Sequence, residues 1–292
     1  MAQELPDCLI SADAGVNSDY LPQRVVCLQP SATATLAGLG LLSRVVACTR
    51  WCLDVCPEVA EYKPVIVEDS WTARSGEILG AKPDLVIAAV PYQEKALAEI
   101  LKARIRLLAL APRTLSDISG DIATVARTLG AEERGQEIIL KMQAEITRVR
   151  EIAARAARRP RVFCEEWGKP IIRSQQWVAE LVDAAGGEFV GSPGRQATPE
   201  EVGASDADVI VCAWCGAGDR VPLEKIVSQR GWESLSAVNQ RRVYCVPDEF
   251  LNTPALTLLE GLKALAWAIH PELFPRPGRV RRIQDKTAQA LP

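Results

Sequence analysis

The chain has 292 residues, 48% of them apolar, and a formal net charge of −3. This length allows one large domain or two of ordinary size, and the apolar content is enough to bury a core. The slightly acidic balance argues against a general nucleic-acid-binding protein, and no apolar run is long enough to insert into a membrane.

In chain order, residues 1–23 show no periodicity and predict a loose N-terminal arm. Strand and helix patterns alternate through residues 24–130, where buried apolar segments such as PDLVIAAV precede amphipathic ones. Such alternation predicts a parallel sheet with right-handed crossovers. We therefore expect an N-terminal α/β lobe here.

The longest helical pattern occupies the segment from Ala131 to Arg159, within a linking region at residues 131–160. Apolar residues recur at helical spacing, charges lie between them, and Pro160 prevents continuation. At 1.5 Å per residue, such a helix is about 40 Å long. We interpret it as a rigid linking helix between two lobes.

After the linking helix the alternation begins again. Residues 161–274 predict a C-terminal α/β lobe that closes with the amphipathic segment TPALTLLEGLKALAWAIH. Residues 275–292 are basic and contain proline, which predicts a poorly packed tail.

The chain has nine cysteines and one histidine. The odd number excludes a complete set of internal disulfides. The N-terminal segment has neither the basic start nor the apolar core of a signal peptide, so we expect a cytoplasmic protein, with the periplasm as the alternative if a leader was removed. In the cytoplasm, free thiols or metal ligands are favoured over disulfides.

Two groups of cysteines follow predicted strands: Cys48, Cys52 and Cys56, and then Cys212 and Cys215. Ligands bind beyond the carboxyl ends of the strands in open parallel sheets, so both groups would face a cleft between the lobes. Because thiolates favour zinc, copper(I) or iron–sulfur clusters, these five residues could form a metal site. The alternative is that they are small, buried apolar residues.

Tryptophans also fall in loops or at the ends of predicted elements, namely Trp51, Trp71, Trp167, Trp177 and Trp214. Tryptophan is commonly a core residue, but five in such positions suggest an apolar floor for a large flat ligand. The phosphate-binding glycine motifs and the G-x-S-x-G motif are missing, and the single histidine ends a predicted helix. The sequence therefore favours a binding protein over an enzyme.

Several segments resemble the cobalamin-binding-like, helical-backbone (class III) periplasmic substrate-binding proteins of ABC importers. The similar segments are RVVCLQPSATATLAGLGLLSRVVACT, TRWCLDVCPE, KPDLVIAA, EEWGKPIIRSQQWVAELVDAAGG, VIVCAWCGAGDR and TPALTLLEGLKALAWAIHPELF, within residues 24–274. The resemblance implies two Rossmann-like α/β lobes with parallel sheets, joined by one long backbone helix, with the ligand cleft between the lobes.

The resemblance also implies a ligand and a partner. We expect a corrinoid (cobalamin-like) or a related metal-chelate ligand in the interlobe cleft, contacted by Trp51, Glu166, Trp167, Arg173, Trp177 and Trp214. Glu77 and Glu200 occupy the positions at which the family docks an ABC permease. The alternative function is a cysteine-ligated zinc or iron–sulfur protein with a redox or sensing role in the same cleft.

Overall fold

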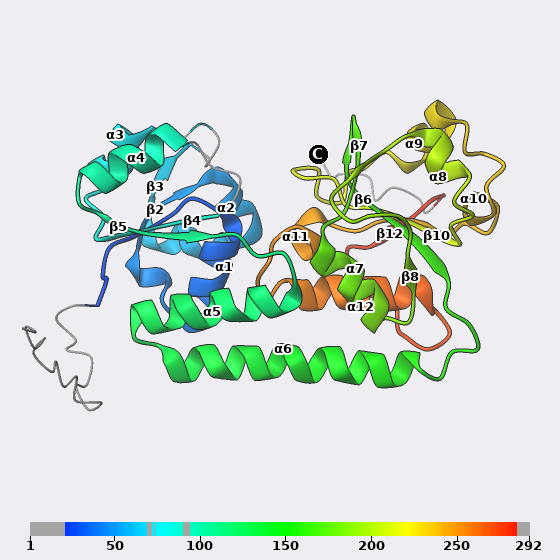
Figure 1. Cartoon of the computed structure of the whole chain (residues 1–292), viewed down its shortest axis with the longest axis horizontal. Coiled ribbons are helices and arrows are strands. Elements are labelled where there is room, and N and C mark those ends of the chain that lie inside the picture. Colours follow the sequence, from blue (N-terminus) through cyan, green and yellow to red (C-terminus); the bar gives the residue numbers. More distant parts are fainter. Residues whose placement is uncertain (1–20, 69–71, 73, 90–93, 285–292) are drawn as a thin grey trace, which may run out of the picture.

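The computed structural model describes residues 21–68, 72, 74–89 and 94–284. They form two α/β lobes that lie side by side above one long helix (Figure 1). Within the described residues, no helix combines the length and the apolar character needed to cross a membrane.

The N-terminal lobe is built on a five-stranded sheet in the order β3-β2-β1-β4-β5, in which every neighbouring pair is parallel. Its elements are β1 (Val25–Cys27), α1 (Pro30–Leu39), η2 (Leu42–Arg44), β2 (Val45–Thr49), α2 (Arg50–Val55), η3 (Pro57–Tyr62), β3 (Val65–Val67), α3 (Ser75–Gly80), β4 (Leu85–Ala89), α4 (Glu94–Lys102), β5 (Arg106–Leu110) and α5 (Leu115–Leu129). The strand order reverses beside β1, which makes the carboxyl ends of β1 and β4 the expected ligand-binding edge of this sheet.

The C-terminal lobe has a mixed sheet in the order β12-β11-β10-β6-β7-β9, with β8 also pairing with β6. Its elements are β6 (Arg161–Gly168), β7 (Ile171–Arg173), α7 (Gln176–Ala184), β8 (Glu188–Phe189), β9 (Gln196–Ala197), α8 (Pro199–Gly203), β10 (Val209–Cys212), α9 (Leu223–Arg230), α10 (Ser236–Asn239), β11 (Val243–Cys245), α11 (Asp248–Leu251), α12 (Leu258–Ile269) and β12 (Arg281–Arg282). Strands β6, β8, β10 and β11 are parallel, as expected, whereas β7, β9 and β12 pair antiparallel to their neighbours.

The linking helix is α6 (Glu132–Ala153), which runs along both lobes (Figure 1). It ends six residues earlier than the sequence pattern predicts, so its length is about 33 Å. The arginines expected in its last turn contact the C-terminal lobe instead: Arg158 binds Asp208 at 2.9 Å and Arg159 binds Asp183 at 2.6 Å. These ion pairs turn the chain toward β6 before Pro160.

Helix α6 packs on α1 and α5 of the N-terminal lobe and on α7 and α12 of the C-terminal lobe. Gly135 allows α5 to approach closely, because a Cβ at this position would lie only 2.4 Å from the Cβ of Ala126. One continuous apolar cluster extends from Val25 through α6 to Val280. The two lobes therefore share a core instead of being linked by a flexible tether.

The predicted loose tail is wrong for residues 275–284. Val280 and Ile283 are buried, and β12 pairs antiparallel with β11. Arg281 explains this packing, since its guanidinium donates to the backbone carbonyls of Asp219 and Val221 at 2.6 Å each.

Candidate functional site between the lobes

The two lobes meet where Trp51 of α2 lies against the backbone of Gly216. A Cβ at Gly216 would lie 3.2 Å from two carbon atoms of the Trp51 ring, and the Arg50 guanidinium lies 4.1 Å from the centre of that ring. Trp51 follows the carboxyl end of β2, and Gly216 follows the carboxyl end of β10. The strand ends of both sheets thus converge on one place, as the sequence predicts.

The loop that carries Gly216 is held in shape by Asp248, the first residue of α11. One carboxylate oxygen of Asp248 accepts from the Gly216 amide at 2.8 Å, and the other accepts from the Gly218 amide at 2.7 Å. Both glycines have positive φ, +77° and +56°, a conformation that most side chains disfavour. The loop therefore has a fixed backbone that presents Cys215 and Gly216 to the other lobe.

Cys215 is the exposed cysteine of this loop. Its sulfur accepts from Asn252 Nδ2 at 3.2 Å. Desolvation by the surrounding protein, with repulsion from the Glu166 and Asp248 carboxylates, raises the pKa of the Cys215 thiol to about 12. Without a bound metal, the neutral thiol is therefore the favoured form of Cys215 at neutral pH.

Glu165 and Glu166 point to opposite sides of β6. Glu165 is fully buried and binds Arg230 through both of its oxygens, at 2.7 and 2.8 Å, and it also accepts from Trp214 Nε1 at 2.8 Å. Glu166 is half-buried on the other side and accepts from Gln175 at 2.5 Å. Desolvation raises the pKa of the Glu166 carboxyl to about 7.

Trp214 and Trp167 lie near this end of β6. Trp214 packs against Gly168, where a Cβ would come within 2.4 Å of its ring, and Trp214 remains partly exposed. Trp167 is 44% exposed, and its indole nitrogen donates to the Lys169 carbonyl. Both rings therefore present accessible aromatic surface at this end of β6.

Two of the predicted ligand-contacting residues bond to other parts of the C-terminal lobe. Trp177 is a core residue, 9% exposed, and its indole nitrogen donates to the Leu251 carbonyl at 2.8 Å. The Arg173 guanidinium donates to the Gln196 carbonyl at 2.7 Å and lies 3.5 Å from Glu201, which ties β7 to β9 and α8. These bonds give both residues a structural role, and their predicted contacts with a ligand stay predictions. Trp71 lies outside the described residues.

The five cysteines do not assemble into a metal site. Cys48, Cys52 and Cys56 are buried in the N-terminal lobe, and Cys212 is buried among apolar side chains of the C-terminal lobe. In the described part of the chain, no three His, Cys, Asp or Glu side chains are grouped so that they could hold a metal ion. The predicted cysteine-ligated zinc or iron–sulfur centre is therefore not supported.

The reason is the direction of the side chains. Cys48 pairs with Cys27 of β1 in register, inside the sheet, and Cys52 points back from α2 so that its sulfur lies 3.3 Å from Thr49 Oγ1. A hydrogen bond with Cys48 lowers the pKa of Cys52 to about 7, while burial raises that of Cys56 to about 12. The thiols of Cys48 and Cys52 interact with each other in the core, and Cys56 donates to the Glu58 carboxylate at 3.3 Å.

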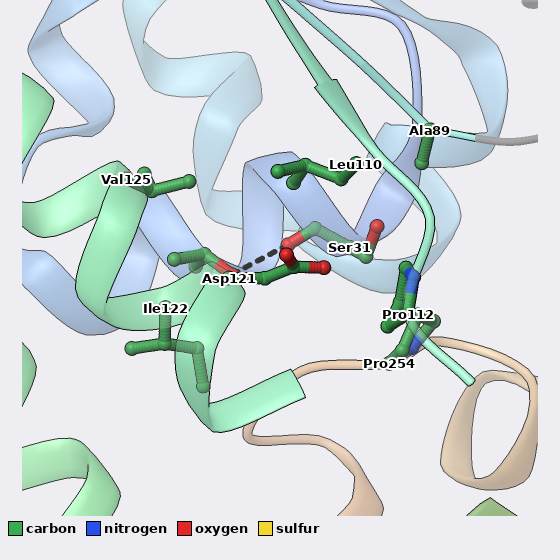
Figure 2. Close-up of a pocket in the computed structure, with 9 residues that line it drawn as sticks. Ser31, Ala89, Leu110, Pro112, Asp121, Ile122, Val125 and Pro254 are labelled. Atoms are coloured by element: carbon green, nitrogen blue, oxygen red, sulfur yellow. Dashed lines mark hydrogen bonds between the residues drawn. The ribbon is translucent and has the colours of Figure 1, made fainter. Parts of the chain in front are cut away.

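A small pocket of about 10 Å³ lies in the N-terminal lobe, next to Pro254 of the C-terminal lobe (Figure 2). Its lining includes Ser31 at the start of α1, Ala89 and Leu110 at the ends of their strands, and Pro254. The Asp121 carboxylate of α5 points into it, and burial, with repulsion from Asp117, raises the pKa of Asp121 to about 6. The pocket holds no more than one water molecule.

Asp248, Asn252 and Gln175 contribute to the site but were not predicted from the sequence. Asp248 follows the carboxyl end of β11, so the rule that located Cys215 would also have found Asp248. Gln175 follows β7, a strand too short to predict, and Asn252 follows α11, so only the three-dimensional structure brings them to Glu166 and Cys215.

Cys215 offers a direct test of this arrangement. In a Cys8→Ser variant of the native protein, we expect a maleimide to modify Cys215 alone, because the other described cysteines are buried. The reaction should be slow at pH 7, since a thiol of pKa about 12 has roughly 10³-fold less thiolate than one of pKa ~8.5. Mass spectrometry of peptides gives the position, and a further Cys215→Ser change should remove the label. Native labelling of Cys48, Cys52 or Cys56 would contradict their burial.

Comparison with known proteins identifies the family of this chain. Residues 25–250 match the family described as periplasmic binding protein. The chain belongs to this family. The expected two-lobed fold and the resemblance to cobalamin-binding-like class III substrate-binding proteins are thereby confirmed.

Three similar proteins illustrate the range of the family. An uncharacterized ABC transporter substrate-binding lipoprotein of Bacillus subtilis, YvrC, is 24% identical over 281 residues, which cover 91% of this chain and 87% of the relative. A vitamin B12-binding protein of Pectobacterium carotovorum is 29% identical over 191 residues, 62% of this chain and 68% of the relative. The structure of the heme-binding protein RhuT from Roseiflexus, in its apo form, has a TM-score of 0.76 at 23% identity and covers 85% of this chain and 98% of RhuT.

Proposed function

We propose that this protein binds a corrinoid, or a closely related large metal-chelate ligand, between its two lobes. The observation that carries the proposal is the meeting of Trp51 with the Cys215–Gly216 loop, because it brings the strand ends of both sheets to one place. The vitamin B12-binding relative favours a corrinoid among the possible ligands.

The chemistry of the site fits a large ligand with a flat apolar face and polar side groups. Trp51, Trp167 and Trp214 provide accessible aromatic surface, and aromatic side chains contribute strongly to binding by burying a large area. The Glu166 carboxyl and the Asn252 amide provide hydrogen-bonding groups next to Cys215. A corrin ring with amide-bearing side chains presents both kinds of surface.

Calorimetric titration of the purified protein with cyanocobalamin, cobinamide and hemin tests the proposal. We expect heat and one-to-one binding with at least one of the two corrinoids. Trp51→Ala should weaken the affinity by about 30-fold or more, because truncation of a central aromatic contact costs about 2 kcal/mol or more. Trp51→Phe, which keeps an aromatic face, should retain most of the affinity.

The other outcomes distinguish a wrong choice of ligand from a wrong choice of binding site. Absence of heat with both corrinoids would overturn the corrinoid proposal. Binding of hemin alone would assign a different chelate to the same cleft. Equal affinities for wild type, Trp51→Ala and Trp51→Phe would place the ligand away from Trp51.

We also propose that Glu77 and Glu200 dock an ABC permease. Both are exposed, and the helices that carry them, α3 and α8, lie on the side of the two lobes opposite α6 (Figure 1). Charge reversal at both positions should abolish uptake in cells while leaving ligand binding in solution unchanged. Docking requires the exported form of the protein, which cell fractionation would detect. Uptake that survives the double reversal would overturn the assignment.

A further inference from the structure

A second pocket, of about 470 Å³, lies on the C-terminal lobe, away from the site between the lobes. Its walls come from the segment that leaves α6, from the end of α12 and from β11 and β12. In Figure 1 the ends of α6 and α12 that form it lie at the side of the C-terminal lobe farthest from the N-terminal lobe. The family relationship and the proposed ligand do not account for this pocket.

The lining is rich in arginine. Arg158, Arg242 and Arg282 line the pocket. Among the described lining residues, Glu272 is the one with a carboxylate. Glu272 is engaged by His270, whose Nδ1 lies 3.2 Å from the Glu272 carboxylate. Positive side chains therefore outnumber negative ones, although the whole chain is slightly acidic.

Arg242 is only partly satisfied by the protein. One of its terminal nitrogens donates to the Ala268 and Ile269 carbonyls at the end of α12, at 3.2 and 2.8 Å. Its Nε is buried and has no hydrogen-bond partner within the described part of the chain. Burial raises the pKa of the Tyr244 hydroxyl in the lining, but the charge of Arg242, with that of Arg282, holds this pKa below the value that burial alone would give.

Arg158 provides a second cation at the rim. It forms an ion pair with Asp208 at 2.9 Å, but its side chain is 59% exposed and can reorient at little cost. The rest of the lining is largely apolar and includes Ala157, Ile269 and the ring of Tyr244. The pocket thus combines cations with an apolar wall.

We propose that this pocket is a binding site for a small organic oxyanion, a phosphate or carboxylate attached to a small apolar group. Arginine presents several donors in a plane that matches such anions, and the volume lies in the range of small-molecule sites. The site is independent of the ligand between the lobes. A bound anion would join the end of the linking helix to α12 and β12.

Phenyl phosphate and benzoate are suitable probes, because they share one apolar body and differ in the anionic group, and phenol is the neutral control. We expect calorimetry at low ionic strength to detect binding of at least one anion and none of phenol. Ala157→Glu places a negative charge in the lining and should weaken the affinity by about tenfold or more. Ala157→Gln has the same size without the charge and should bind nearly as wild type does.

Two further measurements complete the test. Ala154→Glu adds the same charge at the end of α6, outside the lining, and should leave the affinity within about twofold of wild type, whereas cyanocobalamin binding should be the same in all variants. Thermal unfolding of each variant shows that it is folded. No binding of either anion by the folded wild-type protein would overturn the proposal, as would equal affinities of the Ala157→Glu and Ala157→Gln variants.

Discussion

Replacing Arg230 with methionine is expected to lower the free energy of unfolding by about 3–5 kcal/mol, because the change leaves a buried carboxylate without its cation. Glu165 is fully buried, and Arg230, which is 9% exposed, binds both of its oxygens. Arg230 also donates to the Gly168 carbonyl and lies 4.8 Å from the ring centre of Trp232. Urea unfolding at pH 7, followed by tryptophan fluorescence, measures the effect.

A matched exposed pair provides the control. On α6, Arg148 binds both oxygens of Glu145 at 2.8 and 2.7 Å, with the Arg148 side chain 54% exposed. Arg148→Met should change stability by only about 0.5 kcal/mol, since water screens and replaces exposed ion pairs. The double change Glu165→Leu/Arg230→Met should recover most of the stability lost in Arg230→Met. If Arg230→Met and Arg148→Met lower the free energy of unfolding by the same amount, burial does not determine the strength of the ion pair.

The same ion pair connects stability to the proposed binding site. The Glu165 carboxylate that holds Arg230 also accepts from Trp214, whose ring packs on Gly168. Loss of Arg230 therefore affects the aromatic side chain next to Cys215 as well as the core. We expect ligand affinity and stability to fall together in Arg230→Met, while in Arg148→Met neither changes appreciably.

The fold was largely predictable because the alternation of strands and helices is strong. Buried runs such as Leu85–Ala89 and Val209–Cys212 lie in strands, as the sequence indicates. The short strands β7, β9 and β12 were missed because two or three residues carry no periodicity. The strand β12 depends on bonds from Arg281 to a loop about 60 residues away, which local composition does not reveal.

The site was only partly predictable, for a geometric reason. The position of a residue after a strand end can be read from the sequence, and Trp51 after β2 and the Cys215–Gly216 loop after β10 meet between the lobes. Side-chain direction depends on register and on short helices such as α2, so Cys52 and Cys212 were assigned to the cleft although both are buried. Cysteines that lack the spacing of a known metal motif are therefore at least as consistent with core packing as with metal binding.

Glu166 is expected to make the folded protein less stable as the pH rises from about 4.5 to about 7. Desolvation raises the pKa of its carboxyl from 4.5 to about 7. Within this range the folded state keeps a proton that the unfolded state has released, and stability then falls with rising pH. The loss is complete above about pH 7, and a shift of this size corresponds to at most about 3 kcal/mol.

Urea unfolding of wild type and Glu166→Gln across pH 4.5–8 isolates this contribution. Glutamine keeps an acceptor for Gln175 but does not titrate, so the stability difference between the two proteins should change across the range and level off above it. Asp121, whose raised pKa acts in the same direction, is present in both proteins and cancels in the difference. A difference that stays constant from pH 4.5 to 8 would show that Glu166 is fully solvated.

Ligand binding should also change the protonation of the Glu166 carboxyl. Glu166 lies beside Cys215, so a ligand between the lobes would remove more water from the Glu166 carboxyl and raise its pKa further. Binding near pH 7 would then take up a proton, and the measured heat would depend on the ionisation enthalpy of the buffer. The Glu166→Gln variant should lose this dependence on the buffer. Proton uptake that persists in the variant would assign it to another group.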